Sequence, residues 1–334
     1  MQLDIHVIRR VTHGAARVEQ TADGFRFHRF HEGEEALYQN TWAEPLLQAP
    51  AGVRLLFRTD SRCLSLAGVT ERVSPVRSLY GIDILVNGVL RCFIGNCDAS
   101  AVETPYAERE YPLGPFRQEL SLGEGEKTVE ICLPYGVGFA LRELSLEDGA
   151  SVEAVKCDRR LLAYGDSITH GYDAWHPSAR YTARLCRALG ADEYNKGIGG
   201  AIYDPHLAAL RQPWVPDDIT IAYGTNDFGS VRPQELRENC RRFLAHIAAH
   251  YPTSRIYVIS PLCRLDRTEN ETFGKFGTVG EIIAQEAAQI PHAVYIDGLP
   301  CIPGETSYFG DGRLHPNDTG FALYSEAIYR KFVS

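Results

Sequence analysis

Residues 161–169 read Leu161-Leu162-Ala163-Tyr164-Gly165-Asp166-Ser167-Ile168-Thr169, a short apolar run that stops abruptly at Gly-Asp-Ser. An apolar run of this length, ended by a glycine, predicts a buried β-strand. A serine at the carboxyl end of such a strand is well placed to attack a bound substrate. Ser167 is therefore the candidate nucleophile of the chain.

The sequence after this run alternates between short apolar segments and helical patterns. We expect strands at 161–164, 193–195, 219–223, 256–259 and 294–296, and helices at 178–189, 232–250, 279–290 and 319–331. Alternation of this kind predicts a parallel sheet covered by helices. Such a sheet binds its ligand in the crevice at the carboxyl ends of the strands.

The first half of the chain has a different periodicity. Its apolar runs are short, often alternating and separated by turn residues, as at 53–58, 82–86, 128–133 and 140–146, and Asn87-Gly88 is a strong signal for a two-residue hairpin. Many short strands without a long helix predict an all-β sandwich of the jelly-roll kind. We therefore expect two domains, a β-sandwich at 1–157 and an α/β domain at 158–334.

Composition narrows the range of partners and compartments. The chain has 334 residues, 44% of them hydrophobic, and a net charge of −9, which argues against nucleic acid or an anionic membrane as its main partner. Its nine cysteines form no C-x-x-C pair, and the amino terminus lacks the pattern of a secretory signal. These features favour free thiols in the cytoplasm.

Three later motifs supply partners for the candidate nucleophile. They are Asn195-Lys196-Gly197-Ile198-Gly199-Gly200, then Gly224-Thr225-Asn226-Asp227, and finally Asp311-Gly312-Arg313-Leu314-His315-Pro316-Asn317. A serine hydroxyl needs a base within hydrogen-bond reach, and His315 suits this role because it stands in a loop just before the last predicted helix. The negative oxygen of a tetrahedral intermediate needs hydrogen-bond donors. Candidates are the backbone N–H groups of Ser167 and Gly200 and the side-chain amide of Asn226.

These four motifs resemble the SGNH (GDSL) hydrolase superfamily, which places its serine, glycine, asparagine and histidine in blocks of this order. The resemblance assigns Ser167, Gly200, Asn226 and His315 to those roles and implies a flavodoxin-like α/β/α domain. In the first half, residues 57–61 and the run Tyr80-Gly81-Ile82-Asp83-Ile84-Leu85 are similar to a β-sandwich domain that precedes some SGNH esterases. That domain is marked by a Gly-x-Asp-Leu-Tyr signature, whose last two residues are replaced here by Ile84 and Leu85.

The acid that orients the histidine is the point of departure from the family pattern. The family's aspartate stands three residues before the histidine, where this chain has Gly312, and the nearby acid is Asp311, four residues before His315. Asp311 reaches the imidazole if the loop bulges. Otherwise a backbone carbonyl orients His315 and the site is a Ser-His dyad, as is thought for some carbohydrate esterases of the superfamily.

Substrate specificity has weaker signals. Tyr172 and Trp175 follow the first motif and could line an acyl or sugar pocket, although ordinary core packing explains them equally well. Arg264 lies in a long polar loop after the fourth predicted strand, where a charged residue favours a polar substrate over a long-chain lipid. We find no pattern typical of a metal site or a nucleotide cofactor, and an acyl-enzyme mechanism needs neither.

Three functions remain open at this stage. The first is an esterase that removes small acyl groups, acetyl above all, from a polar substrate such as an oligosaccharide. The second is an acyltransferase that passes the same acyl group to an alcohol. The third is a carbohydrate-binding protein with an inactive site, which the presence of Ser167, Asn226 and His315 together argues against.

Overall fold

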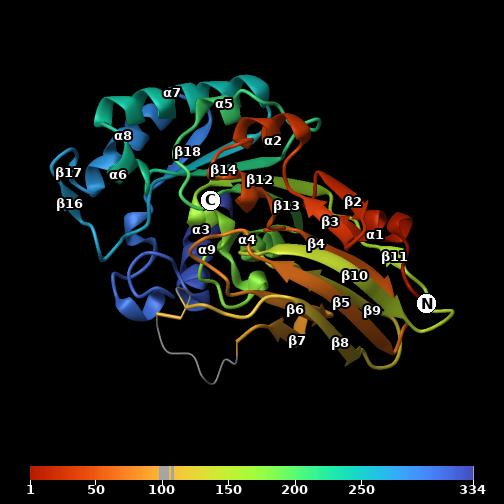
Figure 1. Cartoon of the computed structure of the whole chain (residues 1–334). Coiled ribbons are helices and arrows are strands. Elements are labelled where there is room, and N and C mark those ends of the chain that lie inside the picture. The colour runs from red at the N-terminus through yellow and green to blue at the C-terminus, as the bar shows by residue number, and fades with distance from the viewer. Residues whose placement is uncertain (98–104, 107–108, 334) are drawn as a thin grey trace.

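The computed structural model describes residues 1–97, 105–106 and 109–333, and the chain forms a β-sandwich packed against an α/β/α domain (Figure 1). Both architectures are those expected from the sequence. None of the helices in the described ranges is both long and apolar enough to cross a bilayer.

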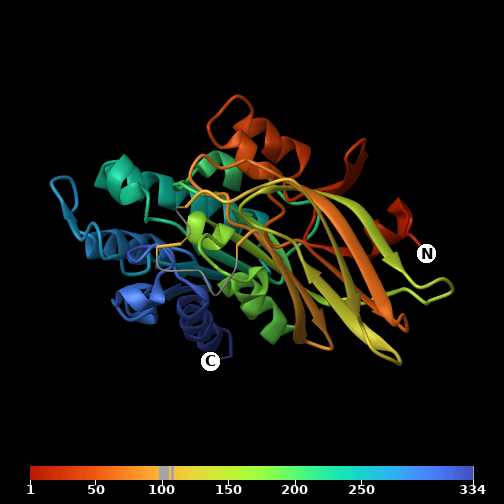
Figure 2. The same ribbon diagram turned by 60° about the horizontal axis from the view of Figure 1, so that its bottom comes forward.

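Two facing antiparallel sheets make up the sandwich. One has the strand order β2-β3-β10-β5-β8, and the other has the order β1-β4-β9-β6-β7 with β11 beside β4. Their strong curvature is clear in the turned view (Figure 2). The strands are β1 (Thr12–His13), β2 (Arg17–Thr21), β3 (Gly24–His28), β4 (Arg54–Thr59), β5 (Cys63–Glu71), β6 (Gly81–Val86), β7 (Val89–Gly95), β8 (Pro115–Ser121), β9 (Lys127–Cys132), β10 (Gly138–Leu146) and β11 (Glu153–Ala154).

The expected hairpin joins β6 to β7. Asn87 and Gly88 have φ angles of 51° and 78°, the left-handed pair that a type I′ turn requires. The structure also adds short helices to a region expected to be all β: α1 (Ile5–Val11), α2 (Glu32–Tyr38) and the 3-10 turn η1 (Glu44–Gln48). Helices of seven residues are too short to show a clear period in the sequence.

The second half contains a five-stranded parallel sheet of order β13-β12-β14-β15-β18. This is the flavodoxin-like order, in which the first strand lies beside both the second and the third. The strands are β12 (Arg159–Gly165), β13 (Ala191–Gly197), β14 (Asp218–Ala222), β15 (Arg255–Ile259) and β18 (Ala293–Ile296). Gly165 is in register with both Gly197 and Ala222, so the loops after these three strands emerge side by side.

Helices cover both faces of this sheet. One core joins the sheet to α7 (Pro233–His250) and α8 (Gly277–Ala287), and a second core on the other face joins it to α4 (Tyr181–Leu189) and α9 (Asp318–Val333). The remaining elements are α3 (Ser167–His170), η3 (Pro177–Ala179), α5 (Pro205–Ala208), α6 (Asp227–Ser230), the β16 (Glu269–Asn270) and β17 (Gly274–Lys275) ribbon, η4 (Leu299–Cys301) and η5 (Thr306–Tyr308).

The two halves meet through a polar, buried interface. Lys196 of β13 forms an ion pair with Glu34 of α2, with 2.6 Å between Nζ and Oε2. Arg29, which follows β3, donates to the carbonyl oxygens of Asn195 and Gly197 at 2.9 and 3.0 Å. Only residues 155–158 separate β11 in the sandwich from β12 in the parallel sheet. We retain 1–157 and 158–334 as the proposed domain division.

Candidate active site

Ser167 is the first residue of α3 and follows β12, an inner strand of the parallel sheet, with only Asp166 between them. Asp166 caps this helix, because its Oδ1 accepts the N–H of Ile168 at 2.9 Å. Burial raises the pKa of the Asp166 carboxyl to about 6. Gly165 leaves room for the sharp turn, since a side chain there would collide with Thr169. The local sequence thus turns the chain tightly enough to present the serine hydroxyl at the strand end.

His315 meets this hydroxyl from the loop between η5 and α9. Its Nε2 lies 2.8 Å from Ser167 Oγ, and its Nδ1 lies 2.7 Å from Asp311 Oδ2. The structure therefore brings together the serine, the histidine and the acid whose reach the sequence left open. The imidazole is a bridge between the hydroxyl and a buried carboxylate.

The loop reaches this geometry by wrapping around Asp311. Oδ1 of Asp311 accepts the backbone N–H groups of Arg313, Leu314 and His315 at 3.0, 2.8 and 3.1 Å. Gly312 has a φ of +75°, a conformation that glycine adopts readily, and this accommodates the extra residue between acid and base. Burial opposes ionisation of Asp311, but the contact with His315 and the N–H groups outweigh it and hold its pKa well below the usual range.

Gly200 and Asn226 lie in the loops beyond β13 and β14, on the same cleft as Ser167. Gly200 has a φ of +83°, and its N–H forms no hydrogen bond with the described residues. Asn226 Nδ2 donates one hydrogen to the carbonyl oxygen of Ala201 at 2.9 Å, which leaves its second hydrogen available. The N–H of Ser167, as the first residue of a helix, has no partner within that helix.

His170 contacts the loop that contains Gly199 and Gly200. It is fully buried, its Nδ1 accepts the N–H of Gly199 at 3.2 Å, and its Nε2 lies 2.7 Å from the carbonyl oxygen of Tyr135. Burial lowers the pKa of the His170 imidazole well below its usual value, so the ring is neutral and donates from Nε2 to Tyr135. The ring therefore holds the backbone just before Gly200 and connects it to the sandwich.

The cleft over Ser167 has a volume of about 620 Å³, and both halves of the chain line it. Trp42, Leu46, Pro75, Val76 and Arg77 come from the sandwich, whereas Tyr172, Arg313 and Leu314 come from the α/β domain. The Trp42 side chain is 65% exposed and stands over Gly200, where an added Cβ would lie 3.0 Å from the indole.

The structure places only one of the three residues expected to bind substrate in the cleft. Tyr172 lines the cleft, but Trp175 and Arg264 do not. The Trp175 ring stacks on Phe93 of the sandwich at 5.9 Å between centroids. The Arg264 guanidinium donates to both carboxylate oxygens of Asp266, at 2.7 and 3.0 Å, and so stabilises its own loop. We therefore assign Trp175 and Arg264 to packing and loop structure.

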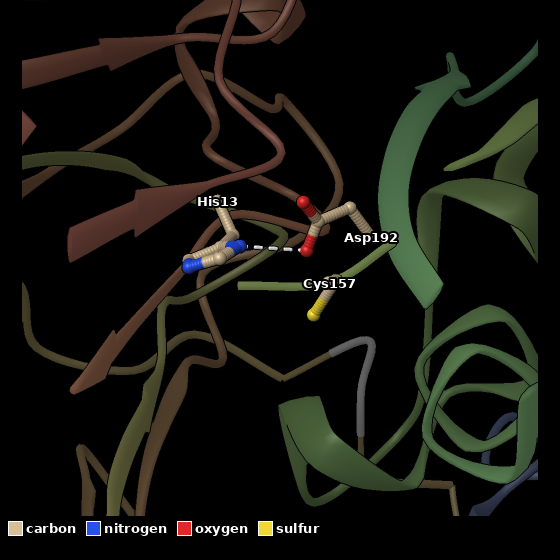
Figure 3. A group of neighbouring side chains, drawn as sticks. All are labelled: His13, Cys157 and Asp192. Carbon is tan, nitrogen blue, oxygen red and sulfur yellow. Dashed lines mark hydrogen bonds and ion pairs between the residues drawn. The ribbon is translucent and has the colours of Figure 1, made fainter. Parts of the chain in front are cut away.

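Two clusters in the described part of the chain bring His, Cys and Asp side chains close enough to share a cation. They are His13 with Cys157 and Asp192 (Figure 3), and Asp173 with Asp311 and His315. An arginine already supplies positive charge to each. Arg54 Nη2 lies 3.4 Å from both Cys157 Sγ and Asp192 Oδ1, and Arg77 Nη2 lies 3.5 Å from His315 Nδ1. Charge repulsion therefore opposes a metal ion in both clusters.

Sequence reasoning missed Trp42, Arg77 and Asp173. A tryptophan within the polar run Gln39-Asn40-Thr41-Trp42 was an available signal, because large aromatic side chains are rarely left in polar segments without a contact. Arg77 and Asp173 gave no local signal, since their roles arise only when distant segments meet.

Residues 163–323 match the model of the GDSL-like Lipase/Acylhydrolase family, so the chain contains a domain of that type. The fold, the site and this match together define a serine ester hydrolase with an SGNH-type α/β/α domain. No curated protein matches the chain significantly.

Solved structures share the whole architecture. The salicylyl-acyltransferase SsfX3 from a tetracycline biosynthetic pathway is 23% identical with a TM-score of 0.81, covering 96% of this chain and 93% of that one. A protein described as a GDSL-like lipase from Bacteroides ovatus is 19% identical with a TM-score of 0.75, covering 98% and 96%. A family two carbohydrate esterase from Clostridium thermocellum, in complex with cellohexaose, is 13% identical with a TM-score of 0.64, covering 84% and 92%. At these identities the likeness establishes the fold.

Proposed function

We propose that this protein hydrolyses small acyl esters, acetyl esters above all, of a polar and carbohydrate-like alcohol through an acyl-enzyme. One observation supports this more than any other, the continuous contact from Ser167 Oγ to His315 Nε2 at 2.8 Å and from His315 Nδ1 to Asp311 Oδ2 at 2.7 Å. A hydroxyl, an imidazole and a buried carboxylate in this order are the parts that nucleophilic acyl transfer needs.

In the first half-reaction, Ser167 Oγ attacks the ester carbonyl carbon while His315 Nε2 takes the hydroxyl proton. The carbonyl oxygen becomes negative and is stabilised by the N–H groups of Ser167 and Gly200 and by Nδ2 of Asn226. Removal of one such donor typically costs about 3 to 4 kcal/mol of barrier lowering. The intermediate collapses when His315 returns the proton to the departing alkoxide, which leaves as an alcohol.

In the second half-reaction, water replaces the alcohol. His315 takes a proton from this water, the new oxygen bonds to the acyl carbon, and the proton then returns to Ser167 Oγ as the carboxylic acid leaves. Asp311 keeps the imidazole in the tautomer that presents Nε2 to Ser167 and stabilises the imidazolium that forms in both steps.

The cleft supports a polar substrate with a small acyl group. Glu110 and Arg313 place charges of both signs along it, and the exposed indole of Trp42 offers a flat apolar face on which a sugar ring can stack. The close approach of Trp42 to Gly200 leaves little space on that side of the nucleophile for a long acyl chain. Similar solved structures include a carbohydrate esterase with bound cellohexaose and an acetyl xylan esterase.

A second candidate is acyl transfer from the same acyl-enzyme to an alcohol. Apolar side chains in the cleft favour it, namely Leu46, Pro75 and Val76, because they would exclude water and hold an apolar acceptor. One of the similar structures is a salicylyl-acyltransferase. Product analysis with an added acceptor alcohol distinguishes the two candidates, since transfer gives a new ester and hydrolysis gives only the acid.

The decisive experiment compares Ser167→Ala with a matched control, Ser145→Ala, which removes a hydroxyl from β10 of the sandwich. We expect Ser167→Ala to lose turnover of p-nitrophenyl acetate by several orders of magnitude and to lose labelling by a fluorophosphonate, whereas Ser145→Ala keeps both. Acetate, butyrate and octanoate esters compared on the parent protein test the preference for short acyl groups. Parental labelling of Ser167→Ala would refute the nucleophile assignment.

We also propose that the protein works in the cytoplasm. All nine cysteines are free thiols, which suits a reducing compartment. The net charge of −9 favours a neutral or cationic small molecule over nucleic acid as the ligand.

A further inference from the structure

A second carboxylate lies behind the imidazole of His315. Asp173, in the loop after α3, is fully buried and its Oδ2 lies 3.8 Å from His315 Nδ1. Its φ of +70° lies in the left-handed region, which residues other than glycine adopt uncommonly, and Gly310 packs so closely that an added Cβ would lie 2.7 Å from the Asp173 Cβ. A strained, buried carboxylate pressed against the loop that holds the base is a costly arrangement, so it needs a reason.

The sandwich supplies the counter-charge. Arg77, in the segment between β5 and β6, donates from Nε to Asp173 Oδ1 at 2.8 Å and from Nη2 to Oδ2 at 3.3 Å. The same Nη2 lies 3.5 Å from His315 Nδ1, and the guanidinium lies over the ring of Tyr172. The Arg77 side chain is only 7% exposed, so little solvent screens these contacts.

The imidazole therefore faces three charges at close range, two negative and one positive. Asp311 is its hydrogen-bond partner, and the charges of Asp173 and Arg77 largely cancel at the ring. Other ionisable or charged groups also face the ring or its partners: Ser167, the buried Asp166, Tyr172, Tyr106, whose hydroxyl donates to the carbonyl oxygen of Asp173 at 2.6 Å, and Arg313, whose Nε lies 3.8 Å from Asp311 Oδ2. If Arg77 were removed, two carboxylates would face one ring and would favour its protonated form.

We propose that Arg77 and Asp173 form a positioning pair through which the sandwich controls the charge next to His315, the base of the proposed reaction. This inference rests on the proposed function, in which a neutral imidazole accepts the Ser167 proton. Arg77 acts by its positive charge, and Asp173 acts by its opposing negative charge and by holding the Arg77 guanidinium in place. The pair thus makes the sandwich a functional part of the catalytic centre.

The test measures kcat/KM for p-nitrophenyl acetate against pH in four proteins besides the parent. The acidic limb is the part of this profile in which kcat/KM falls as the pH is lowered. Arg77→Met should move it to higher pH by about one unit, since a charge within a few ångströms shifts a titration by that amount. On the steep part of the limb this corresponds to about a tenfold loss of kcat/KM. Asp173→Asn leaves Arg77 uncompensated and should move the limb to lower pH. The double variant removes a neutral pair and should return the limb close to its parental position. Arg77→Lys keeps the charge and should also stay close to it.

The matched control is Arg54→Met, which removes a partly buried arginine of the sandwich that also contacts the α/β domain. Arg54 donates to the carbonyl oxygen of Ala191 at the amino end of β13, away from the cleft. We expect it to lower the melting temperature without moving the acidic limb. The pH at which the His315 ring signals titrate, followed by NMR in a Ser167→Ala background, should move in the same directions and needs no activity.

Opposite shifts in the two single variants, with cancellation in the double variant, support the pair, because loss of structure alone gives no such cancellation. Unmoved limbs in Arg77→Met and Asp173→Asn would overturn it. Failure of the proposed function would give a different result, because Ser167→Ala would then keep the ester turnover of the parent protein.

Discussion

Replacement of Lys196 by methionine tests how strongly the two halves of the chain depend on each other. The Lys196 Nζ donates to Glu34 Oε2 at 2.6 Å and to the carbonyl oxygen of Arg29 at 2.7 Å, and the two side chains are 1% and 0% exposed. Burial lowers the pKa of the Lys196 ammonium, although the charge of Glu34 opposes this. Methionine fills a similar volume but leaves the Glu34 carboxylate buried without its cation.

The expected cost is about 3 to 5 kcal/mol, the usual range when one member of a buried ion pair is removed. Since a typical domain is stable by about 5 to 15 kcal/mol, the variant should lose about a fifth or more of its free energy of unfolding. The double variant Lys196→Met/Glu34→Gln buries no bare charge and should be more stable than the single variant. Arg330→Met is the control, because its pair with Glu326 is 74% and 57% exposed and should contribute less than about 1 kcal/mol.

Urea unfolding, followed by tryptophan fluorescence and by far-UV circular dichroism, measures these differences. Trp42 lies in the sandwich, and Trp175 and Trp214 lie in the α/β domain, so the fluorescence reports on both halves. Coincident transitions by the two methods would show that both halves unfold together. A cost below about 1 kcal/mol for Lys196→Met, or a double variant as unstable as the single one, would refute the reasoning.

The other predictions concern the site and the domain division. His315→Ala should lose most ester turnover, and Asp311→Asn should lose nearly as much, because the carboxylate contacts the imidazole directly; a mild Asp311→Asn effect would favour a backbone carbonyl as the orienting group. Gly200→Ala should lower kcat, since alanine is strained at a φ of +83° and its Cβ would approach Trp42. Retention of parental kcat in Gly200→Ala would argue against a role for that loop in the oxyanion hole. Residues 158–334 expressed alone should be poorly soluble or less stable than the whole chain and should turn over p-nitrophenyl acetate more slowly, and a fragment with parental melting and turnover would show that the sandwich is dispensable.

The parallel sheet could be predicted from sequence because four of its five strands contain a short apolar run next to a helical pattern, whereas β13 is mostly polar. That alternation also placed Ser167 at a strand end and His315 before the last helix, which is enough to expect them near each other. The reach of Asp311 could not be predicted in the same way. It depends on the left-handed Gly312 and on three backbone N–H groups that converge on one oxygen, and no residue pattern encodes that convergence.

Contacts between distant segments could not be predicted from the sequence either, because no local residue pattern encodes them. Arg77 and Asp173 are 96 residues apart and lie in different halves of the chain. Trp175 and Arg264 were sensible candidates by position, because both follow strands that end at the site. Neither lines the cleft, since the Trp175 ring packs on the sandwich and the Arg264 guanidinium pairs with Asp266.

The aspartate of the Gly81-Ile82-Asp83 run connects the sandwich to the segment that follows the nucleophile helix. Asp83 is fully buried, its Oδ1 lies 2.7 Å from His176 Nδ1, and its Oδ2 accepts the N–H of Ser178 at 2.9 Å. Tyr135 adds a hydrogen bond from its hydroxyl to the carbonyl oxygen of Ala174 at 2.6 Å. The sandwich therefore holds the whole segment that follows the nucleophile helix, residues 171–178, at several points. That segment also contains Asp173, which lies next to the catalytic imidazole. A change in the packing of the sandwich against residues 171–178 would therefore alter the surroundings of His315. For this reason we expect the two halves to act as one enzyme.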